Sequence, residues 1–374
     1  MCCSGNSFPF TTGGELRFNS PMEFPHLRYI PSLDQTVIEE RLEKLLVTGP
    51  LSDNDLNGRI ARLEERFSLY AALSPHGLWA PGLVITPEMR RASEFYLPQE
   101  EIGCACRRLL VLSLKAVPFL PAAGLHSLPS WLDLLHRLQP LVREANPARL
   151  LRRLMGDNEF RCRFLFALFL PRHYGGGFDR YPKQAAFLRN SLTEARTPGG
   201  VRCLDAACGS GEGTYDLALL LRECGCIPEK SAVHGATIEP LELFAAAHGW
   251  FPHDPARQAS FRRRIGRLFA GPGTDHIAFF REDLTGKGNC EGEGYDVILC
   301  NGLLGGPLLN GREELERVVG RLCARLRPGG ILLAADRFHR GWKKEVPDNL
   351  LREMLAGCGL KLLAAGEGVA GVRP

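Results

Sequence analysis

The residues that could do chemistry gather in one stretch, Val201–Tyr215, where an apolar run ends in an acid and a glycine-rich turn follows. Asp205 closes the apolar run, and Gly209 and Gly211 follow at the spacing of a tight turn. The apolar run predicts a strand, and the leucines after the turn predict an amphipathic helix. Such a junction opens many α/β sheets, and a ligand can rest against its backbone because glycines lack the Cβ that would block the approach. The stretch therefore indicates a ligand site.

A dinucleotide-binding fingerprint fits this stretch poorly. The pattern G-x-G-x-x-G needs its third glycine one position later than Gly213. The next predicted strand ends in Thr237, where a nicotinamide site needs an acid for the ribose. A nicotinamide-linked oxidoreductase is therefore disfavoured, and we expect no fluorescence change on adding NADH.

The stretch resembles motif I of the class I S-adenosylmethionine-dependent methyltransferases, in which an acid is followed by G-x-G-x-G. The matching residues are Asp205, Ala207, Gly209 and Gly211, and Ala207 stands where the family usually has its first glycine. The resemblance implies that S-adenosylmethionine is the cofactor. The alternative is a glycine turn that only joins a strand to a helix.

Within that superfamily, the sequence around Glu212 and Tyr215 looks most like that of the CheR-type chemotaxis receptor methyltransferases. The likeness is mixed, because that subfamily has serine at the place of Gly209 and a second glutamate at the place of Gly213. The segment Phe178–Tyr181 is similar to the F-x-R element of this subfamily. That element delivers an arginine to the carboxylate of the cofactor, which here is Arg180. The alternative for Arg180 is a surface arginine beside a linker.

The family normally places an acid after the second strand to accept both ribose hydroxyls. Thr237 occupies that place, and a hydroxyl cannot take both in the way a carboxylate can. Glu239, two residues later, is a substitute contact or simply a carboxylate favoured by a helix N-terminus. After the third strand, Asp283 and Leu284 resemble the acid–aliphatic pair that contacts the adenine; the alternative for Asp283 is a solvated loop acid.

The fourth strand resembles the D-V-I-x-C run of the family and ends at Asn301, followed by Gly302. CheR-type enzymes continue with R-N-V here, so this chain has lost that arginine. The resemblance places Asn301 and Gly302 near the cofactor, on the wall of the acceptor pocket. No general base stands out, and methyl transfer by in-line displacement needs none when the acceptor is a carboxylate. Asp336 and His339 are the titratable candidates near the open face, and the catalytic residues stay unassigned.

Composition sets broad limits. A chain of 374 residues suggests about two domains. Its net charge of +4 argues against nucleic acid as a partner, no apolar run is long enough to span a membrane, and no signal peptide is recognisable, which predicts a cytoplasmic protein. The 13 cysteines are read as free thiols because their number is odd and their C-x-C pairs lack further ligands, so we expect no metal site.

The first half of the chain is predicted to be helical. After an irregular lead-in over residues 1–30, apolar residues recur at three- and four-residue steps from Asp34 and from Asp53. Further helical runs are 86 onward, 102–117, 130–144 and 147–170. No alternating strand pattern precedes residue 200. The glycines at 175–177 are the best linker, so we predict an all-α domain over 1–175.

Strands and helices alternate after residue 200, which predicts a Rossmann-like, mostly parallel seven-stranded sheet with helices on both faces in a domain spanning 176–374. The strand candidates are 201–205, 232–238, 277–281, 295–300, 330–335, 360–364 and 368–372, the last two forming an antiparallel hairpin. The helix candidates are 213–224, 240–248, 256–269, 311–326 and 347–358.

Arginines recur at helical spacing in two places, which predicts solvated helix faces or an acidic protein partner. They are Arg149, Arg152, Arg153, Arg161 and Arg163, and Arg257, Arg262, Arg263, Arg264 and Arg267. The second group lies in Phe251–Asp275, where CheR-type enzymes that dock on receptor tails insert a small β-subdomain. Its apolar residues have helical spacing, so we expect one helix over the crevice, with its arginines toward solvent or an acidic acceptor.

The sequence thus predicts a CheR-like methyltransferase. Its methyl acceptor is not identified and is a small molecule or a protein carboxylate. The alternative is a module that binds S-adenosylmethionine or S-adenosylhomocysteine and regulates a partner without turnover.

Overall fold

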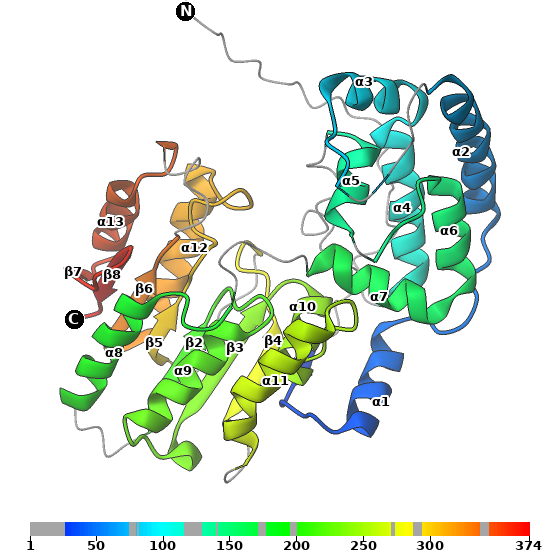
Figure 1. The fold of residues 1–374 in the computed structure, drawn as a ribbon. Helices are drawn as coiled ribbons and strands as arrows, with labels where there is room; N and C mark the ends of the chain where they lie inside the picture. Colours follow the sequence, from blue (N-terminus) through cyan, green and yellow to red (C-terminus); the bar gives the residue numbers. More distant parts are fainter. Residues whose placement is uncertain are drawn as a thin grey trace, which may run out of the picture.

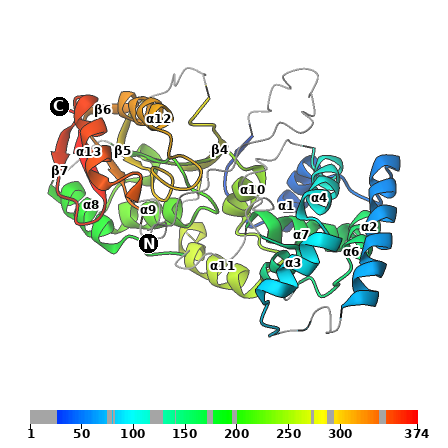
Figure 2. The ribbon, with the colours of Figure 1, turned by 90° about the horizontal axis from the view of Figure 1, so that it is seen from above.

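The computed structural model describes most of the chain (Figure 1). The described residues are 27–74, 80, 82–115, 129–139, 141–170, 177–194, 200–270, 274–286, 294–336 and 344–374. Helices dominate up to residue 170, and an α/β sheet follows; Figure 2 shows the helical region beside the sheet. The predicted domain boundary at 175/176 and two glycines of the predicted linker lie outside the described residues.

The helical region contains the predicted helices, with changed ends. They are α1 (Gln35–Leu45), α2 (Asn54–Leu73), α3 (Pro87–Tyr96), α4 (Gln99–Ser113), α5 (Trp131–Arg137), α6 (Pro147–Gly156) and α7 (Asn158–Phe169). Asp34 and Asp53 cap α1 and α2, because their side chains accept hydrogen bonds from Val37 N and Leu56 N. The predicted run at 130–144 is shorter than expected, and the run at 147–170 is two helices. The break falls at Asp157, whose carboxylate accepts from Phe160 N and so caps α7.

Arg161 is the largest departure from the surface pattern predicted for this region. Its side chain is only 1% exposed, although its spacing predicted a solvated helix face or an acidic partner. Its guanidinium donates to five oxygens: the carbonyls of Leu154, Met155, Val47 and Gly49 and the side chain of Asn158. Arg161 therefore joins the end of α6, the start of α7 and the loop before α2.

Within the described residues the sheet has eight strands, one more than the seven predicted. They are β1 (Arg28–Tyr29), β2 (Arg202–Asp205), β3 (Ala232–Thr237), β4 (Ile277–Arg281), β5 (Tyr295–Leu299), β6 (Leu326–Ala334), β7 (Lys361–Leu363) and β8 (Val369–Val372). The additional strand, β1, lies in the first half of the chain, which is therefore not all-α. It pairs antiparallel with β4, and its two residues are too few to show alternation in a sequence.

The strand order is β1-β4-β3-β2-β5-β6-β8-β7. Strands β4, β3, β2, β5 and β6 are mutually parallel, and β8 is antiparallel to both of its neighbours, as predicted for the terminal hairpin. The chain moves outward from β2 to β4 and then returns to the other side of β2 with β5. This reversal of direction, at β2 and β5, is the switch point of a doubly wound sheet.

Helices cover both faces of the sheet. They are α8 (Pro182–Glu194), α9 (Glu212–Glu223), α10 (Pro240–His248), α11 (Pro255–Phe269), α12 (Arg312–Ala324) and α13 (Asp348–Gly357), with a 3-10 turn η2 (Pro228–Lys230). Side chains of β2 and β5 alternate between two apolar clusters: Cys203 and Val297 face the one that includes α9 and α10, while Leu204 and Ile298 face the one that includes α12 and α13.

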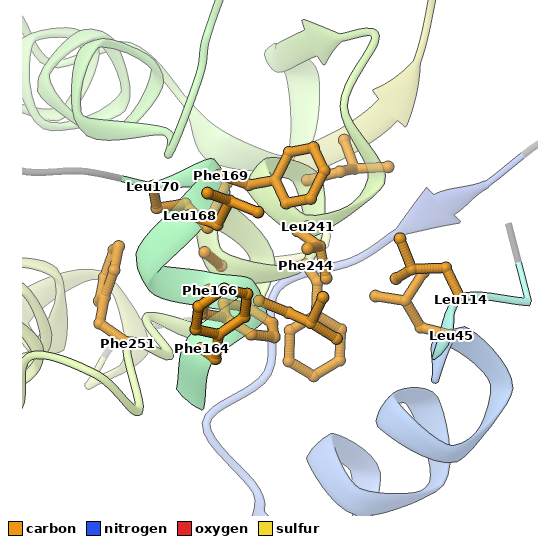
Figure 3. Close-up of a cluster of buried hydrophobic side chains, with 14 of the residues drawn as sticks. Leu45, Leu114, Phe164, Phe166, Leu168, Phe169, Leu170, Leu241, Phe244 and Phe251 are labelled. Atoms are coloured by element: carbon orange, nitrogen blue, oxygen red, sulfur yellow. The ribbon is translucent and has the colours of Figure 1, made fainter. Parts of the chain in front are cut away.

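The helical region packs on the sheet through α7 and α10 (Figure 3). The ring of Phe166 in α7 lies edge-on to Phe244 in α10, with centroids 5.9 Å apart, and to Trp250, 4.8 Å away. Both parts therefore belong to one continuous apolar cluster. Because α10 begins at the end of β3, this contact connects the helical region to the switch point.

Candidate functional site: a cleft at the strand ends

A cleft with a volume of about 580 Å³ lies at the carboxyl ends of β2 and β5. This size is typical of sites for small ligands and cofactors, and the switch point is where doubly wound sheets bind them. Of the predicted site residues, six line the cleft: Arg180, Asp205, Ala207, Gly209, Glu212 and Asn301. The other seven lie around it, as described below.

The loop after β2 is held in shape by Asp205, which is 4% exposed. The hydroxyl of Thr214 donates to its carboxylate at 2.9 Å, and the backbone N–H of Ala207 donates as well. Gly213 is needed for this contact, because a Cβ there would lie 2.9 Å from the Asp205 carboxylate. Asp205 thus fixes both ends of the turn and reaches the cleft with its remaining edge.

The two motif glycines play different parts. Gly209 has φ +50° and lines the cleft, and a Cβ on it would meet no atom within 4 Å. Gly211 has φ +90°, and a Cβ on it would lie 2.8 Å from the Cβ of Ala246 in α10. Gly211 therefore allows α9 to pack closely on α10 and does not itself line the cleft.

Tyr215 is buried beneath the loop and does not line the cleft. Its hydroxyl donates to the carbonyl of Ala246 at 2.9 Å, and its ring packs against Phe261 and Phe279. Like Gly211, Tyr215 supports the loop from the core. The sequence predicted both as cofactor contacts because they adjoin residues that do line the cleft.

Just after β3, helix α10 places at the cleft a residue that the sequence did not indicate, Glu242. The hydroxyl of Thr237 donates to the Glu242 carboxylate at 2.8 Å. Thr237 therefore does not offer this hydrogen to a ligand. Glu239 is the N-cap of α10: it accepts from Leu241 N at 3.2 Å, is 1% exposed and does not line the cleft. Glu242, in the first turn of α10, does line it. Glu242 thus places a carboxylate beside Thr237, the position at which the resemblance expects an acid for the ribose.

Asp283, Leu284 and Gly302 lie outside the cleft wall. Asp283 is exposed and accepts from the backbone and hydroxyl of Thr285, while Leu284 is buried in the apolar cluster under α12. Gly302, with φ +77°, donates from its backbone to the carbonyl of Ala335. Leu284 is therefore a core residue. Asp283 is an exposed residue of a turn, which agrees with the alternative of a loop acid.

Asn301 joins two walls of the cleft. Its side-chain oxygen accepts from Ala335 N at 2.8 Å, and its amide nitrogen donates to Gln184 Oε1 at 2.9 Å. Gln184 lies in α8 and is 2% exposed. The amide pair therefore connects the end of β5 to the helix that follows Arg180. Asp336 follows β6 and does not line this cleft, and His339 lies outside the described residues.

Glu212 is bound by an arginine of α11. Arg257 donates to the Glu212 carboxylate at 2.8 Å and to the Ser210 hydroxyl at 2.6 Å, and Ser210 donates to Glu212 at 2.7 Å. The predicted helix within Phe251–Asp275 is confirmed as α11. Three of its five arginines have partners inside the molecule: Arg257, Arg262 and Arg264.

Burial sets the electrostatics of the cleft. It raises the pKa of Asp205 to about 6, although bonds from Thr214 and Ala207 oppose the shift. It raises the pKa of Glu242 to about 7, opposed by the bond from Thr237 and assisted by the nearby Glu212. Clefts with such shifts are characteristic of functional sites.

Other chemistry that the sequence raised is reported for the described residues only. Within these ranges no group of histidine, cysteine or acidic side chains could hold a metal ion. The cysteines described there are free thiols, and burial raises the pKa of the Cys203 and Cys300 thiols. None of the helices built from these residues combines the length and apolarity of a membrane span.

The described residues form an α/β protein with a cleft at the switch point of its sheet. No protein-family model and no curated protein matches the chain. Solved structures to which it is similar include the N-methyltransferase NodS from Bradyrhizobium japonicum WM9, with 18% identity and a TM-score of 0.35 over 53% of this chain and 99% of that one.

Two further structures are similar to the chain. The rRNA methyltransferase aviRa from Streptomyces viridochromogenes has 20% identity and a TM-score of 0.35 over 55% of this chain and 88% of that one. CalS10, an amino pentose methyltransferase from Micromonospora echinaspora, has 20% identity and a TM-score of 0.28 over 44% of this chain, which spans 59% of CalS10. At such values the functional argument rests on the site itself.

Proposed function

We propose that the chain is a class I S-adenosylmethionine-dependent methyltransferase. The observation that carries the proposal is the position of the motif I loop. Asp205, Ala207 and Gly209 line a cleft of cofactor size at the point where the strand order reverses. The contact of this turn with the cleft supports a ligand role over a glycine turn that only joins a strand to a helix.

The side chains of the cleft suit the parts of this cofactor. Arg180 is the partner for the methionine carboxylate, and Glu242, oriented by Thr237, is the acceptor for the ribose hydroxyls. Four carboxylates and two guanidiniums line the cleft, and this acidic excess favours a cationic sulfonium. The residues with these charges are Asp205, Glu212, Glu242, Asp254, Arg180 and Arg257.

The cofactor supplies a methyl group on a sulfonium, which an acceptor takes by in-line displacement. The protein then has to align the two molecules and exclude water, and no base is required when the acceptor is already ionised. Asn301 and its partner Gln184 suit this task, because Gln184 is buried and the amide pair fixes the wall at the end of β5.

We further propose that the enzyme is of the CheR-like type but methylates an acceptor other than a chemoreceptor glutamate. The described residues of Phe251–Asp275 form helix α11 and contain no strand, whereas CheR-type enzymes that dock on receptor tails carry a β-subdomain at this point. A small molecule or a different protein carboxylate is therefore the expected acceptor. Labelled methyl appearing on a chemoreceptor glutamate would contradict this choice.

Binding of S-adenosylhomocysteine tests the proposal directly. A ligand that binds only the folded state raises its stability, by about 2.7 kcal/mol at a hundredfold excess over Kd, so Tm should rise. Arg180→Ala should weaken binding by about 1.5–3 kcal/mol through loss of a charge-assisted contact, and lysine should restore only part of it. The absence of any shift in Tm and of any heat in calorimetry would refute the cofactor assignment.

A binding module without turnover is the second candidate. Thr237 at the ribose-acid position and the replacement of the CheR arginine after Asn301 both favour it. Incubation with methyl-labelled cofactor and whole-cell lysate separates the two, because only an enzyme transfers the label. Binding without any transfer would favour the module.

A further inference from the structure

Helix α11 presents one face to both walls of the cleft. Arg257, Phe261 and Arg264 are spaced by four and three residues, so they lie on the same side of the helix. Arg257 and Phe261 line the cleft, and Arg264 reaches the segment Phe178–Tyr181, which we call the strap. The strap contains Arg180, the proposed partner of the cofactor carboxylate.

The first turn of this face holds the motif I loop. Arg257 bonds both Ser210 and Glu212, and its guanidinium lies 4.2 Å from the ring centroid of Phe251. The side chains of Arg257 and Glu212 are 22% and 13% exposed, so water competes little for this pair. The loop that carries Gly209 is therefore attached to α11 as well as to the sheet.

The other end of the face holds the strap. Arg264 donates to Asp179 at 2.8 Å and to Asp216 of α9 at 3.4 Å, and Asp216 accepts from Asp179 N at 2.5 Å. Asp179 has φ +57°, a left-handed conformation that is uncommon for a residue other than glycine, although aspartate adopts it more readily than most. Asp216 and Arg264 bond Asp179 in this conformation.

Aromatic packing connects the two ends. The ring of Phe261 lies 5.1 Å from that of Phe178 in the strap and 5.7 Å from that of Tyr215 beneath the motif I loop. Arg264 also stacks over Phe178, at 5.6 Å. The same face of α11 thus contacts both the strap and the motif I loop.

We propose that α11 acts as a clasp, and that Arg264 and Asp216 are positioning residues that hold Arg180 in place across the cleft from the motif I loop. Partly exposed ion pairs add little to global stability, so the effect of these residues should appear in the strap rather than in the fold as a whole. The consequence for ligand affinity depends on the proposed function; the clasp itself does not.

Hydrogen exchange on the protein without ligand tests the clasp. In Arg264→Gln the amide of Asp179 should exchange about tenfold faster, because loss of the ion pairs favours local opening of the strap. Arg263→Gln is the matched control, since Arg263 is an exposed arginine on the same helix, and it should leave exchange unchanged. Equal exchange in Arg264→Gln and wild type would overturn the proposal. Asp216→Asn, which retains an acceptor, provides a milder second variant in case Arg264→Gln fails to fold.

A double-mutant cycle then tests the link to Arg180. Arg264→Gln should raise the Kd of S-adenosylhomocysteine about fivefold to tenfold, Arg263→Gln should not, and Arg264→Lys should restore part of the affinity. In an Arg180→Ala background the same change should have little further effect, because the group being positioned is gone. Additive effects would refute the positioning role. Wild-type protein that fails to bind would refute the proposed function, and the exchange measurement would still decide the clasp.

Discussion

In the helical region, acidic side chains lie beside arginines and helix N-termini. Asp53, for example, has a pKa held below its usual range by the bond from Arg108 and by the N–H of Leu56. At the strand ends the reverse holds, because burial raises the pKa values of Asp205 and Glu242 to about 6 and about 7, although hydrogen bonds from Thr214, Ala207 and Thr237 oppose the rise. The same residue type is therefore stabilised in its charged form in one region and destabilised in the other.

The difference indicates which region is adapted to structure and which to a ligand. A carboxylate that is paired within the fold is already stabilised in its charged form. A buried carboxylate with a raised pKa is stabilised in that form when a cationic or hydroxyl-bearing ligand binds beside it. By this criterion the helical region supports the sheet through α7 and α10, and the cleft is where the proposed ligand would bind. Three substitutions would break or sharpen this contrast.

The largest effect is expected at Arg161. Arg161→Ala removes the donor for five buried oxygens, so the free energy of unfolding should fall by about 3–5 kcal/mol. Arg149→Ala, at an exposed position of α6, is the control. Chemical denaturation measures both. At a temperature where the variant is folded, its affinity for S-adenosylhomocysteine should match wild type; a large loss would show that the helical region shapes the cleft.

A smaller effect is expected at Glu242, and it depends on pH. The folded-state pKa of about 7 exceeds the ordinary value of 4.5, so Glu242 adds stability below pH 4.5 that is lost as the pH rises through 7. Glu212 and Arg257 act on it with opposite signs. Glu242→Gln has no such loss, so between pH 4.5 and 8 it should gain on the order of 3 kcal/mol relative to wild type.

Thermal unfolding at several pH values checks this, with Glu223→Gln on the exposed end of α9 as the control. The variant should also bind S-adenosylhomocysteine more weakly above pH 7, since only a carboxylate accepts both ribose hydroxyls strongly. A parallel pH dependence in variant and wild type would contradict the shifted pKa.

The smallest effect on stability is expected at Gly209. Gly209→Ala should cost about 1 kcal/mol of stability for its left-handed backbone, and it should weaken binding of S-adenosylhomocysteine because Gly209 lines the cleft and an added methyl group would take up space there. Gly211→Ala should cost more stability, since its methyl group would collide with Ala246. If calorimetry finds unchanged affinity in Gly209→Ala, the ligand does not approach the loop from this side.

Local patterns were sufficient to predict much of the fold and the glycine turn that lines the cleft. The alternation of strands and helices after residue 200, the caps at Asp34 and Asp53, and the turn around Gly209 are all determined by neighbouring residues. The helix in Phe251–Asp275 was predictable for the same reason.

Contacts between distant segments could not be predicted in this way. Glu242 reaches the cleft only because α10 turns back over the end of β3, and a single sequence does not show that geometry. Arg264 meets Asp179 across 85 positions, so its spacing looked like that of a solvated face. Tyr215 was predicted to contact the cofactor because it adjoins the motif in sequence, but its side chain points into the core.

Strand β1 has a consequence for association between molecules. It lies at the outer edge of the sheet and pairs with Phe279 and Phe280 of β4, and Leu27 O accepts from Arg281 N. An uncovered β4 would offer unpaired backbone groups next to aromatic side chains, which is a template for the strand of another molecule. His248, which bonds the carbonyl of Ser32 at 2.7 Å, anchors the segment to α10. Strand β1 therefore covers this side of β4 and removes one place where a strand of another molecule could pair.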